Sequence, residues 1–406
     1  MSIFRSSRLI ISKIALVFLC FAASYVQAFA INNKNTCESE SAIITSEYDG
    51  GGMSQCSSII PTIFRLVIAP EDENAEQRPP WYSFKVTNKD KEMLIVDVNY
   101  IKGSHQFDPK ISTDGVNWSR LSKDSFNVSD NGHRFQMFLP AMDKPFYISA
   151  QPILDGAQYD RWMDSLVARG AVTKSSIGTS AQGRPIYKIQ SDSDLNTGKY
   201  LFLIGRQHPA EVTGAYAMQS FVETIYSDTP LAREFRKQYG VISIPLVNPD
   251  GVALGYWRNA TGKLDTNWDW GQFGQKETRV ISEELKKFKT RGTLDLFIDF
   301  HGTYDNELYT QFGKMGEWPS SFTKKWTSAV KARLPNYYYN HKKFSFTERH
   351  PGSTEGGSAN QYVYNLLGTT TIIYEEGENT PKAVVEQKGQ VVAEEIMRVL
   401  LTSGTN

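Results

Sequence analysis

An excess of charge of one sign is absent from this sequence, and cysteine and histidine are scarce. The 44 lysines and arginines are matched by 44 aspartates and glutamates, which argues against a protein that grips nucleic acid through a broad basic face. Only three cysteines and six histidines occur in 406 residues, and they form no local cluster, so we expect no cysteine-ligated metal. A content of 40% hydrophobic and 22% charged residues is typical of a soluble globular protein, and the length predicts two or three domains.

The N-terminus also lacks a hydrophobic run long enough to cross a membrane. Its apolar stretch, Ile14–Val26, is shorter than the roughly 20 residues needed to span a hydrocarbon core of about 30 Å. Basic residues precede this stretch, and the small residues Ala28 and Ala30 follow it. This order predicts a secretory signal peptide over residues 1–28, with cleavage after Ala28 or Ala30. The alternative is an uncleaved anchor. We expect a secreted or periplasmic protein without a stable membrane anchor.

Two cysteines, Cys37 and Cys56, remain after the predicted signal peptide. An even pair in a compartment that permits oxidation predicts a disulfide. It would close a short loop rich in glycine and serine, and it would remove about 3 kcal/mol of unfolded-state entropy. We therefore expect residues 29–58 to be a linker stapled by a Cys37–Cys56 disulfide.

Residues 59–154 have the pattern of a small all-β domain. Apolar or alternating stretches of strand length recur there, and they are separated by turn-forming clusters such as Ser112–Gly115. The stretches are 64–68, 81–86 and 94–98. Short strands at this spacing predict a β-sandwich.

Residues 155–406 alternate between buried strands and helices, which predicts an α/β domain. The expected strands are 200–204, 241–247, 294–300 and 371–374, and the expected helices are 211–226, 278–289 and 381–401. The informative polar residues lie at the ends of these strands, where open α/β sheets place their ligands.

Three of these residues have the chemistry of a zinc site. His208 and Glu211 lie three residues apart at the start of a helix, and His301 ends the strand at 294–300. Two imidazole nitrogens and one carboxylate form the ligand set of a catalytic zinc that keeps a position open for water. A His-x-x-Glu pattern alone is weak, because it also occurs at solvated helix starts.

The order of further motifs strengthens this interpretation. The chain contains His208-Pro209-Ala210-Glu211, then Asn248-Pro249-Asp250-Gly251, then Arg258, then Asp265, Asn267 and Trp270, then His301, and finally Glu375. In this order the chain resembles the zinc metallocarboxypeptidase family, with the carboxypeptidase A-like fold, over about residues 175–380. The short spacing from Arg258 to Asp265, and a strand like Trp81–Asn88, resemble the cytosolic-carboxypeptidase branch. The resemblance implies a mixed-sheet α/β catalytic domain preceded by a small β-sandwich.

The resemblance also implies roles for individual residues. It implies that His208, Glu211 and His301 bind one Zn²⁺ per chain, with Asp265 accepting a hydrogen bond from His208 and fixing its tautomer. Glu375 corresponds to the general base that removes a proton from the attacking water.

Two further implied residues act on the substrate. Arg258 corresponds to the cation that stabilises the developing oxyanion, and Asn267 to a residue that binds the terminal carboxylate. Glu376 would point to the opposite face of its strand, so Glu375 is the preferred base.

One position departs from the family pattern. Where the family has an arginine after the Asn that binds the substrate carboxylate, this chain has Trp268, and an indole offers a single N–H in place of a bidentate guanidinium. Arg349 or Lys343 could bind the carboxylate instead. Alternatively, Trp268 stacks on a substrate that lacks an adjacent terminal carboxylate, or it marks a protein that has drifted towards binding.

The sequence therefore predicts an exported zinc-dependent hydrolase that cleaves a peptide or peptide-like amide. Cell-wall stem peptides are candidate substrates on grounds of location alone. The alternatives are a deacylase or amidase of N-acyl amino acids, and a zinc-retaining binding protein with little turnover. No nucleic-acid partner is expected.

Overall fold

Two sheets pack face to face in the N-terminal part of the structure, a computed structural model that describes residues 34–72, 81–191, 198–311, 321–336, 339–344 and 357–403. The first sheet has the order β1-β2-β5-β11-β7-β8, and the second has the order β3-β4-β6-β10-β9. The strands of the first sheet are Thr36–Glu38, Ala42–Thr45, Ser83–Asn88, Phe146–Ser149, Lys110–Ser112 and Ser119–Arg120. Those of the second are Gln55–Ile60, Ile63–Ile68, Leu94–Tyr100, Arg134–Leu139 and Phe126–Ser129.

The prediction that residues 29–58 form a linker is wrong for the residues from 34 onward, which the structure describes. The described residues in this range form β1, β2 and most of β3, and they belong to the sandwich. Ala42 and Ile44 alternate with more exposed neighbours and are buried in the core, because successive side chains of a strand point to opposite faces. Such short strands give little signal in the sequence. Cys37 and Cys56 form a disulfide, which joins β1 of one sheet to β3 of the other.

A mixed eight-stranded sheet forms the centre of the C-terminal part, as the resemblance implied. Its order is β12-β13-β15-β14-β16-β19-β17-β18. The four neighbours β15, β14, β16 and β19 are parallel, and antiparallel pairs lie on either side of them. In chain order the strands are Val172–Thr179, Pro185–Ser191, Lys199–Gly205, Gly240–Ile244, Thr293–Thr303, Glu307–Gln311, Asn340–Phe344 and Thr370–Gly377. All four strands expected from the sequence are present.

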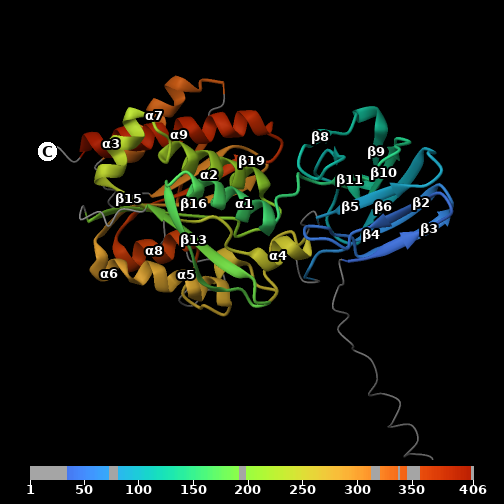
Figure 1. Ribbon diagram of the computed structural model, residues 1–406, viewed down its shortest axis with the longest axis horizontal. Coiled ribbons are helices and arrows are strands. Elements are labelled where there is room, and N and C mark those ends of the chain that lie inside the picture. The colour runs from blue at the N-terminus through green and yellow to red at the C-terminus, as the bar shows by residue number, and fades with distance from the viewer. Residues whose placement is uncertain are drawn as a thin grey trace, which may run out of the picture. The chain divides into compact units, whose positions relative to one another are not determined.

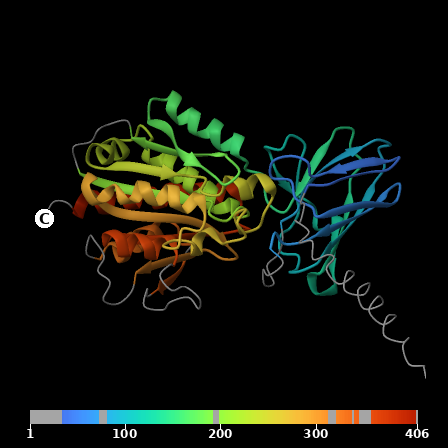
Figure 2. The same cartoon turned by 90° about the horizontal axis from the view of Figure 1, so that it is seen from below.

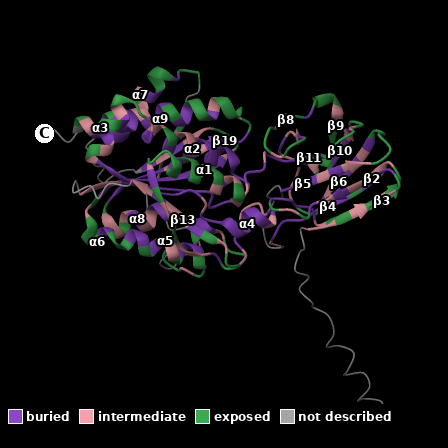
Figure 3. Ribbon diagram, in the orientation of Figure 1, coloured by how far each residue is buried: buried purple, intermediate pink, exposed green. Residues whose placement is uncertain are grey.

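Helices cover both faces of this sheet (Figure 1; turned view in Figure 2). The helices α2, α3, α7 and α9 lie on one face, and α5, α6 and α8 on the other. The nine α-helices among the described residues are Gly156–Ala168, Val212–Ile225, Pro230–Gln238, Pro249–Leu254, Lys276–Lys286, Phe288–Arg291, Phe322–Arg333, Ala359–Leu367 and Lys382–Ser403. This cover explains why the parallel strands are largely apolar and largely buried (Figure 3). None of the described helices is long and apolar enough to cross a membrane.

Candidate metal centre

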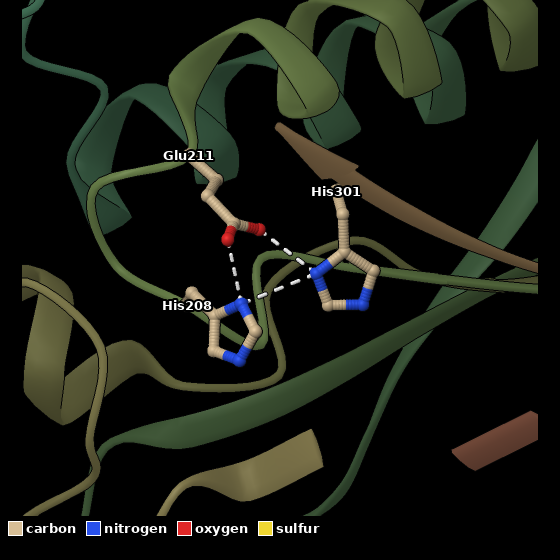
Figure 4. Close-up of side chains that lie close together, drawn as sticks. All are labelled: His208, Glu211 and His301. Carbon is tan, nitrogen blue, oxygen red and sulfur yellow. Dashed lines mark hydrogen bonds and ion pairs between the residues drawn. The ribbon is translucent and has the colours of Figure 1, made fainter. Parts of the chain in front are cut away.

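His208, Glu211 and His301 point toward one another from two segments, the loop between β14 and α2 and the strand β16 (Figure 4). His208 follows β14, Glu211 precedes the first residue of α2, and His301 lies in β16. The Glu211 carboxylate contacts Nδ1 of His208 at 2.7 Å and Nδ1 of His301 at 2.8 Å, and the two Nδ1 atoms are 3.2 Å apart. The three side chains offer one ligand atom each within a radius suited to a single metal ion.

The local chain geometry explains how these elements come so close. After β14 the backbone turns sharply at Arg206, where φ is 58°, and the Arg206 Nε donates to the Pro209 carbonyl at 2.9 Å. The helix α2 then starts directly against β16. A Cβ at Gly214 would lie 2.2 Å from the His301 carbonyl oxygen, so only glycine allows this approach.

On the side away from Glu211, the Nε2 atom of each histidine contacts an aspartate carboxylate. Nε2 of His208 contacts Asp265 at 2.9 Å, and Nε2 of His301 contacts Asp299 at 2.9 Å. A carboxylate accepts hydrogen bonds, so each Nε2 carries a proton, and in its neutral form each imidazole would present the Nδ1 lone pair to the centre. Lone pairs of two nitrogens and a carboxylate facing one point repel one another unless a cation lies between them. The donor set therefore fits zinc.

The electrostatics of the centre favour a cation as well. Burial and the nearby Arg258 lower the pKa of His208, but the Glu211 and Asp265 carboxylates outweigh them and raise it above its ordinary value. Burial likewise lowers the pKa of His301, whereas the Asp299 and Glu211 carboxylates raise it well above the usual range. Burial raises the pKa of Glu211, yet the two histidines hold it below the ordinary value. The raised histidine pKa values show that the surrounding carboxylates favour positive charge at this point, and the lowered pKa of Glu211 keeps its carboxylate ionised.

Glu375 lies beside this centre. In the parallel pairing of β16 with β19 it is the direct neighbour of His301, so both side chains project from the same face of the sheet. Its Oε2 is buried and has no hydrogen-bond partner among the described residues. Burial raises its pKa to about 7, and although His301 lowers this value, Glu211 adds to it.

Glu376 projects from the opposite face, as predicted. Its carboxylate forms a fully buried ion pair with Lys388 at 2.5 Å, and it accepts hydrogen bonds from the hydroxyls of Tyr339 and Tyr374 at 3.1 Å. A carboxylate so fully engaged, and on the far side of the sheet, has no access to the centre.

The structure brings most of the remaining predicted residues to the same region. Arg258 donates from Nε to Asp265, and its side chain is 22% exposed. Oδ1 of Asn267 accepts from the backbone N–H of Ala359 at 3.1 Å, and its Nδ2 lies 3.5 Å from Nε2 of His301. Trp268, in the short 3₁₀ helix Thr266–Trp268, is 38% exposed. Arg349 lies outside the described residues, and so does the side chain of Lys343.

Two residues of the site were not predicted. Asp299 is fully buried and holds His301, and Gln207 donates from Nε2 to Asp299 at 2.7 Å while accepting from Nε1 of Trp270 at 2.9 Å. The sequence does contain a signal from which Asp299 could have been predicted. It is an acid inside an otherwise apolar strand, two residues before His301, and residues two apart in a strand share a face.

Comparison with known proteins is consistent with this site. The family model for zinc carboxypeptidases matches residues 159–388. The chain is 25% identical to mouse cytosolic carboxypeptidase 6 over 355 residues, which cover 80% of this chain and 65% of the mouse protein. For human cytosolic carboxypeptidase 6 the identity is 25% over 358 residues, which cover 80% of this chain and 69% of the human protein. This chain thus spans about two thirds of the length of these relatives.

Two solved structures share the fold over nearly the whole chain. A metallo-carboxypeptidase from Burkholderia cenocepacia matches with a TM-score of 0.73 and 16% identity, covering 89% of this chain and 99% of that chain. A metallo-carboxypeptidase from Pseudomonas aeruginosa, in complex with (2-guanidinoethylmercapto)succinic acid, matches with a TM-score of 0.69 and 21% identity over the same shares of both chains. Because the family model covers more than half of the sequence, this chain belongs to the zinc carboxypeptidase family and is a zinc metallopeptidase.

Proposed function

We propose that this protein is an exported peptidase that hydrolyses a peptide or peptide-like amide, with His208, Glu211 and His301 as the ligands of one zinc ion per chain. The observation that carries this proposal is the orientation of the two imidazoles, whose Nδ1 atoms face the Glu211 carboxylate while other carboxylates hold both Nε2 atoms. Zinc, when bound, supplies Lewis-acid chemistry and lowers the pKa of water from 15.7 to about 7.

Glu375 is the general base of the proposed reaction. Its Oε2, which has no hydrogen-bond partner among the residues that the structure describes, accepts the proton of the attacking water, and the same carboxyl group returns it to the departing amine nitrogen. Burial raises the pKa of this carboxyl above its ordinary value, towards the range that suits a group that must both take and release a proton. Arg258 donates to the carbonyl oxygen as negative charge develops there, a contribution whose loss typically costs about 10²–10³ in rate.

The substrate is a peptide, and Trp268 is the reason to expect an unusual one. Trp268 stands where the family binds the terminal carboxylate with arginine, and its exposed fraction of 38% leaves part of the indole accessible. Cleavage of an amide that lacks an adjacent terminal carboxylate, as in a deacylase or amidase, is therefore the second candidate activity. Cell-wall stem peptides remain a candidate substrate only through the proposed export.

Export is proposed on two grounds. Residues 1–28 have the composition of a signal peptide, although they lie outside the described residues. Cys37 and Cys56 form a disulfide, which persists in oxidising compartments and is rare in the cytosol. The relatives are named cytosolic carboxypeptidases, so this chain would differ from them in location. To test export, the full-length protein is expressed with its own N-terminus and the mass of the mature product is measured. Cleavage after Ala28 and cleavage after Ala30 each predict one defined mass.

The activity is tested by mass spectrometry of products from the zinc-loaded protein, incubated with a mixed peptide library and with isolated stem peptides. Release of one C-terminal residue would establish a carboxypeptidase and require another carboxylate anchor in place of Trp268. An internal cut or a released acyl group would support the second candidate. Absence of any product would contradict an enzymatic role and favour a zinc-retaining binding protein.

Two variants connect any product to the proposed site. Glu375→Gln should keep its zinc and lose turnover by about 10²–10⁴, the usual contribution of a general base. His301→Ala should lose zinc, because two ligands cannot hold it as three do. Full zinc occupancy in His301→Ala would refute the ligand assignment.

A further inference from the structure

A buried carboxylate of the sandwich domain binds the backbone that carries Arg258. Glu71 follows β4 and is 8% exposed. Its two carboxylate oxygens accept hydrogen bonds from consecutive backbone N–H groups of the catalytic domain, those of Trp257 at 3.2 Å, Arg258 at 2.7 Å and Asn259 at 2.8 Å. Such charge-assisted bonds to adjacent amides define a position more closely than a single contact does.

The segment held by Glu71 has little regular structure of its own. Residues 256–260 form no helix or strand, so no ladder of backbone hydrogen bonds fixes them. The Trp257 carbonyl accepts from the Ala210 N–H at 3.2 Å, and the Trp257 ring lies 5.6 Å from that of Phe107 in the sandwich domain. Two of the contacts that fix this loop therefore come from the sandwich domain.

The held segment leads directly to the metal centre. Arg258 donates from Nε to Oδ2 of Asp265, and Oδ1 of the same carboxylate contacts Nε2 of His208. A displacement of the Arg258 backbone would therefore move the guanidinium and disturb the group that orients His208. We propose that Glu71 is a positioning residue for Arg258, so that the sandwich domain takes part in catalysis; this inference rests on the proposed function of Arg258.

A second contact extends the same arrangement to the other side of the site. Gln106 donates from Nε2 to the Glu378 carboxylate at 2.6 Å, and Gln151 donates to the Glu378 carbonyl at 2.8 Å. Glu378 lies three residues after Glu375, directly after the last residue of β19. The sandwich domain thus contacts the chain next to both proposed catalytic residues.

The test compares Glu71→Gln and Glu71→Ala with a matched control, Asp97→Asn. Asp97 is also a buried sandwich carboxylate, 6% exposed, but its ion pairs with Arg65 and Arg134 stay within that domain. A glutamine oxygen cannot accept all three N–H bonds, and alanine accepts none. We expect kcat to fall by about 10- to 100-fold in Glu71→Ala and by less in Glu71→Gln, because a catalytic group misplaced by about 1 Å can cost 10² in rate. Zinc content and KM should change little in both variants. Asp97→Asn should lower the thermal midpoint and leave kcat unchanged.

Two further measurements separate positioning from general stability. Amide hydrogen exchange at Trp257, Arg258 and Asn259 should accelerate in Glu71→Gln and stay unchanged in Asp97→Asn. In a double-mutant cycle, Glu71→Ala should cost almost nothing more once Arg258 is alanine, since residues that act through one another are not additive.

The inference is overturned if exchange at these amides is unaffected, if the kcat losses multiply in the double variant, or if Asp97→Asn loses as much kcat as Glu71→Gln. A zinc-loaded wild-type protein that hydrolyses nothing would instead refute the proposed function and, with it, the catalytic consequence. The exchange measurement would then still decide whether Glu71 fixes the loop.

Discussion

The two histidines of the metal centre are oriented by the same device on opposite sides. Asp265 and Asp299 each accept a hydrogen bond from the Nε2 of one histidine, at 2.9 Å, so that both Nδ1 atoms face the Glu211 carboxylate, where a cation would bind. Hydrogen-bonded carboxylates of this kind fix the ring and raise the basicity of the ligand nitrogen. The tautomer of each proposed ligand histidine is therefore set by an aspartate outside the proposed ligand set.

Asp299→Asn should weaken zinc binding about 10- to 100-fold, the usual effect of losing such a partner. An amide N–H₂ turned toward Nε2 would stabilise the opposite tautomer of His301, whose Nδ1 proton would point at the metal position. Competition with a chelator of known zinc affinity measures the effect. Asp269→Asn is a suitable control, because Asp269 is buried in the same region but accepts from Gly274 and Gln275. Unchanged zinc affinity in Asp299→Asn would contradict the role of the tautomer.

Trp268→Arg tests the specificity argument at a single residue. If the indole is the reason that a terminal carboxylate is poorly held, a guanidinium should raise kcat/KM on simple C-terminal peptide substrates by about tenfold or more, since hydrogen bonds to charged groups contribute about 1.5–3 kcal/mol. The control is Trp268→Lys, which restores the charge without the bidentate geometry and should gain less. Equal activity in all three proteins would show that Trp268 does not determine carboxylate binding.

Some residues of the site could be predicted from the sequence, and others could not. The order of four residues along the chain matches the family pattern, so the sequence alone could reveal them, and the structure brings them together. They are His208, Glu211, His301 and Glu375. Glu71 gave no such signal, because its role depends on which loop of the other domain its carboxylate meets. Contacts between segments 187 residues apart in the chain leave no local pattern.

At the scale of elements, successive side chains of β19 point to opposite faces of the sheet, so that one face of the strand serves the metal centre and the other serves the core. Glu375 faces the metal centre, and its neighbour Glu376 is buried against α9 with Lys388, both side chains being inaccessible to solvent. Burial raises the pKa of Glu376 and lowers that of Lys388, so each charge depends on the other. The pair anchors the end of the strand on which the proposed base lies.

Lys388→Met should destabilise the protein by about 3–5 kcal/mol, because it leaves Glu376 as an uncompensated buried charge. The double variant Glu376→Gln/Lys388→Met should recover most of this loss. Denaturant unfolding measures both. Lys382→Met on the same helix is the control, since the Lys382–Glu386 pair is exposed and 3.6 Å apart and such a surface pair contributes about 0.3–0.5 kcal/mol. A loss in Lys388→Met no larger than in the control would contradict the anchoring role.

Elements with strong periodicity were predictable, and short ones were not. The strands β14, β15, β16 and β19 are largely apolar and largely buried on both faces, so hydrophobic runs of strand length reveal them. The strands β1 and β2 have three and four residues, too few for alternation to emerge from a segment rich in Gly and Ser. They become strands because neighbouring strands provide hydrogen-bond partners and a core.

At the scale of the whole molecule, the sandwich and the catalytic domain form one compact unit from residue 33 onward. Backbone and side-chain hydrogen bonds join them at Glu71, Gln106 and Gln151. We therefore expect cooperative unfolding, in which loss of the sandwich removes the support of the Arg258 loop. The Cys37–Cys56 disulfide, which lies wholly within the sandwich, offers a way to weaken that domain without touching the active site.

The double variant Cys37→Ser/Cys56→Ser should lose about 3 kcal/mol of unfolding free energy, since the disulfide spans 19 residues and cross-links of that length restrict the unfolded chain by about this amount. Its kcat under native conditions should match the wild type, because the folded active site is unchanged. In urea, activity and tryptophan fluorescence should be lost in a single coincident transition at lower concentration than in the wild type. If activity instead survived a first transition of the weakened sandwich, the catalytic domain would not need its partner, and catalysis would rest on the zinc-binding domain alone.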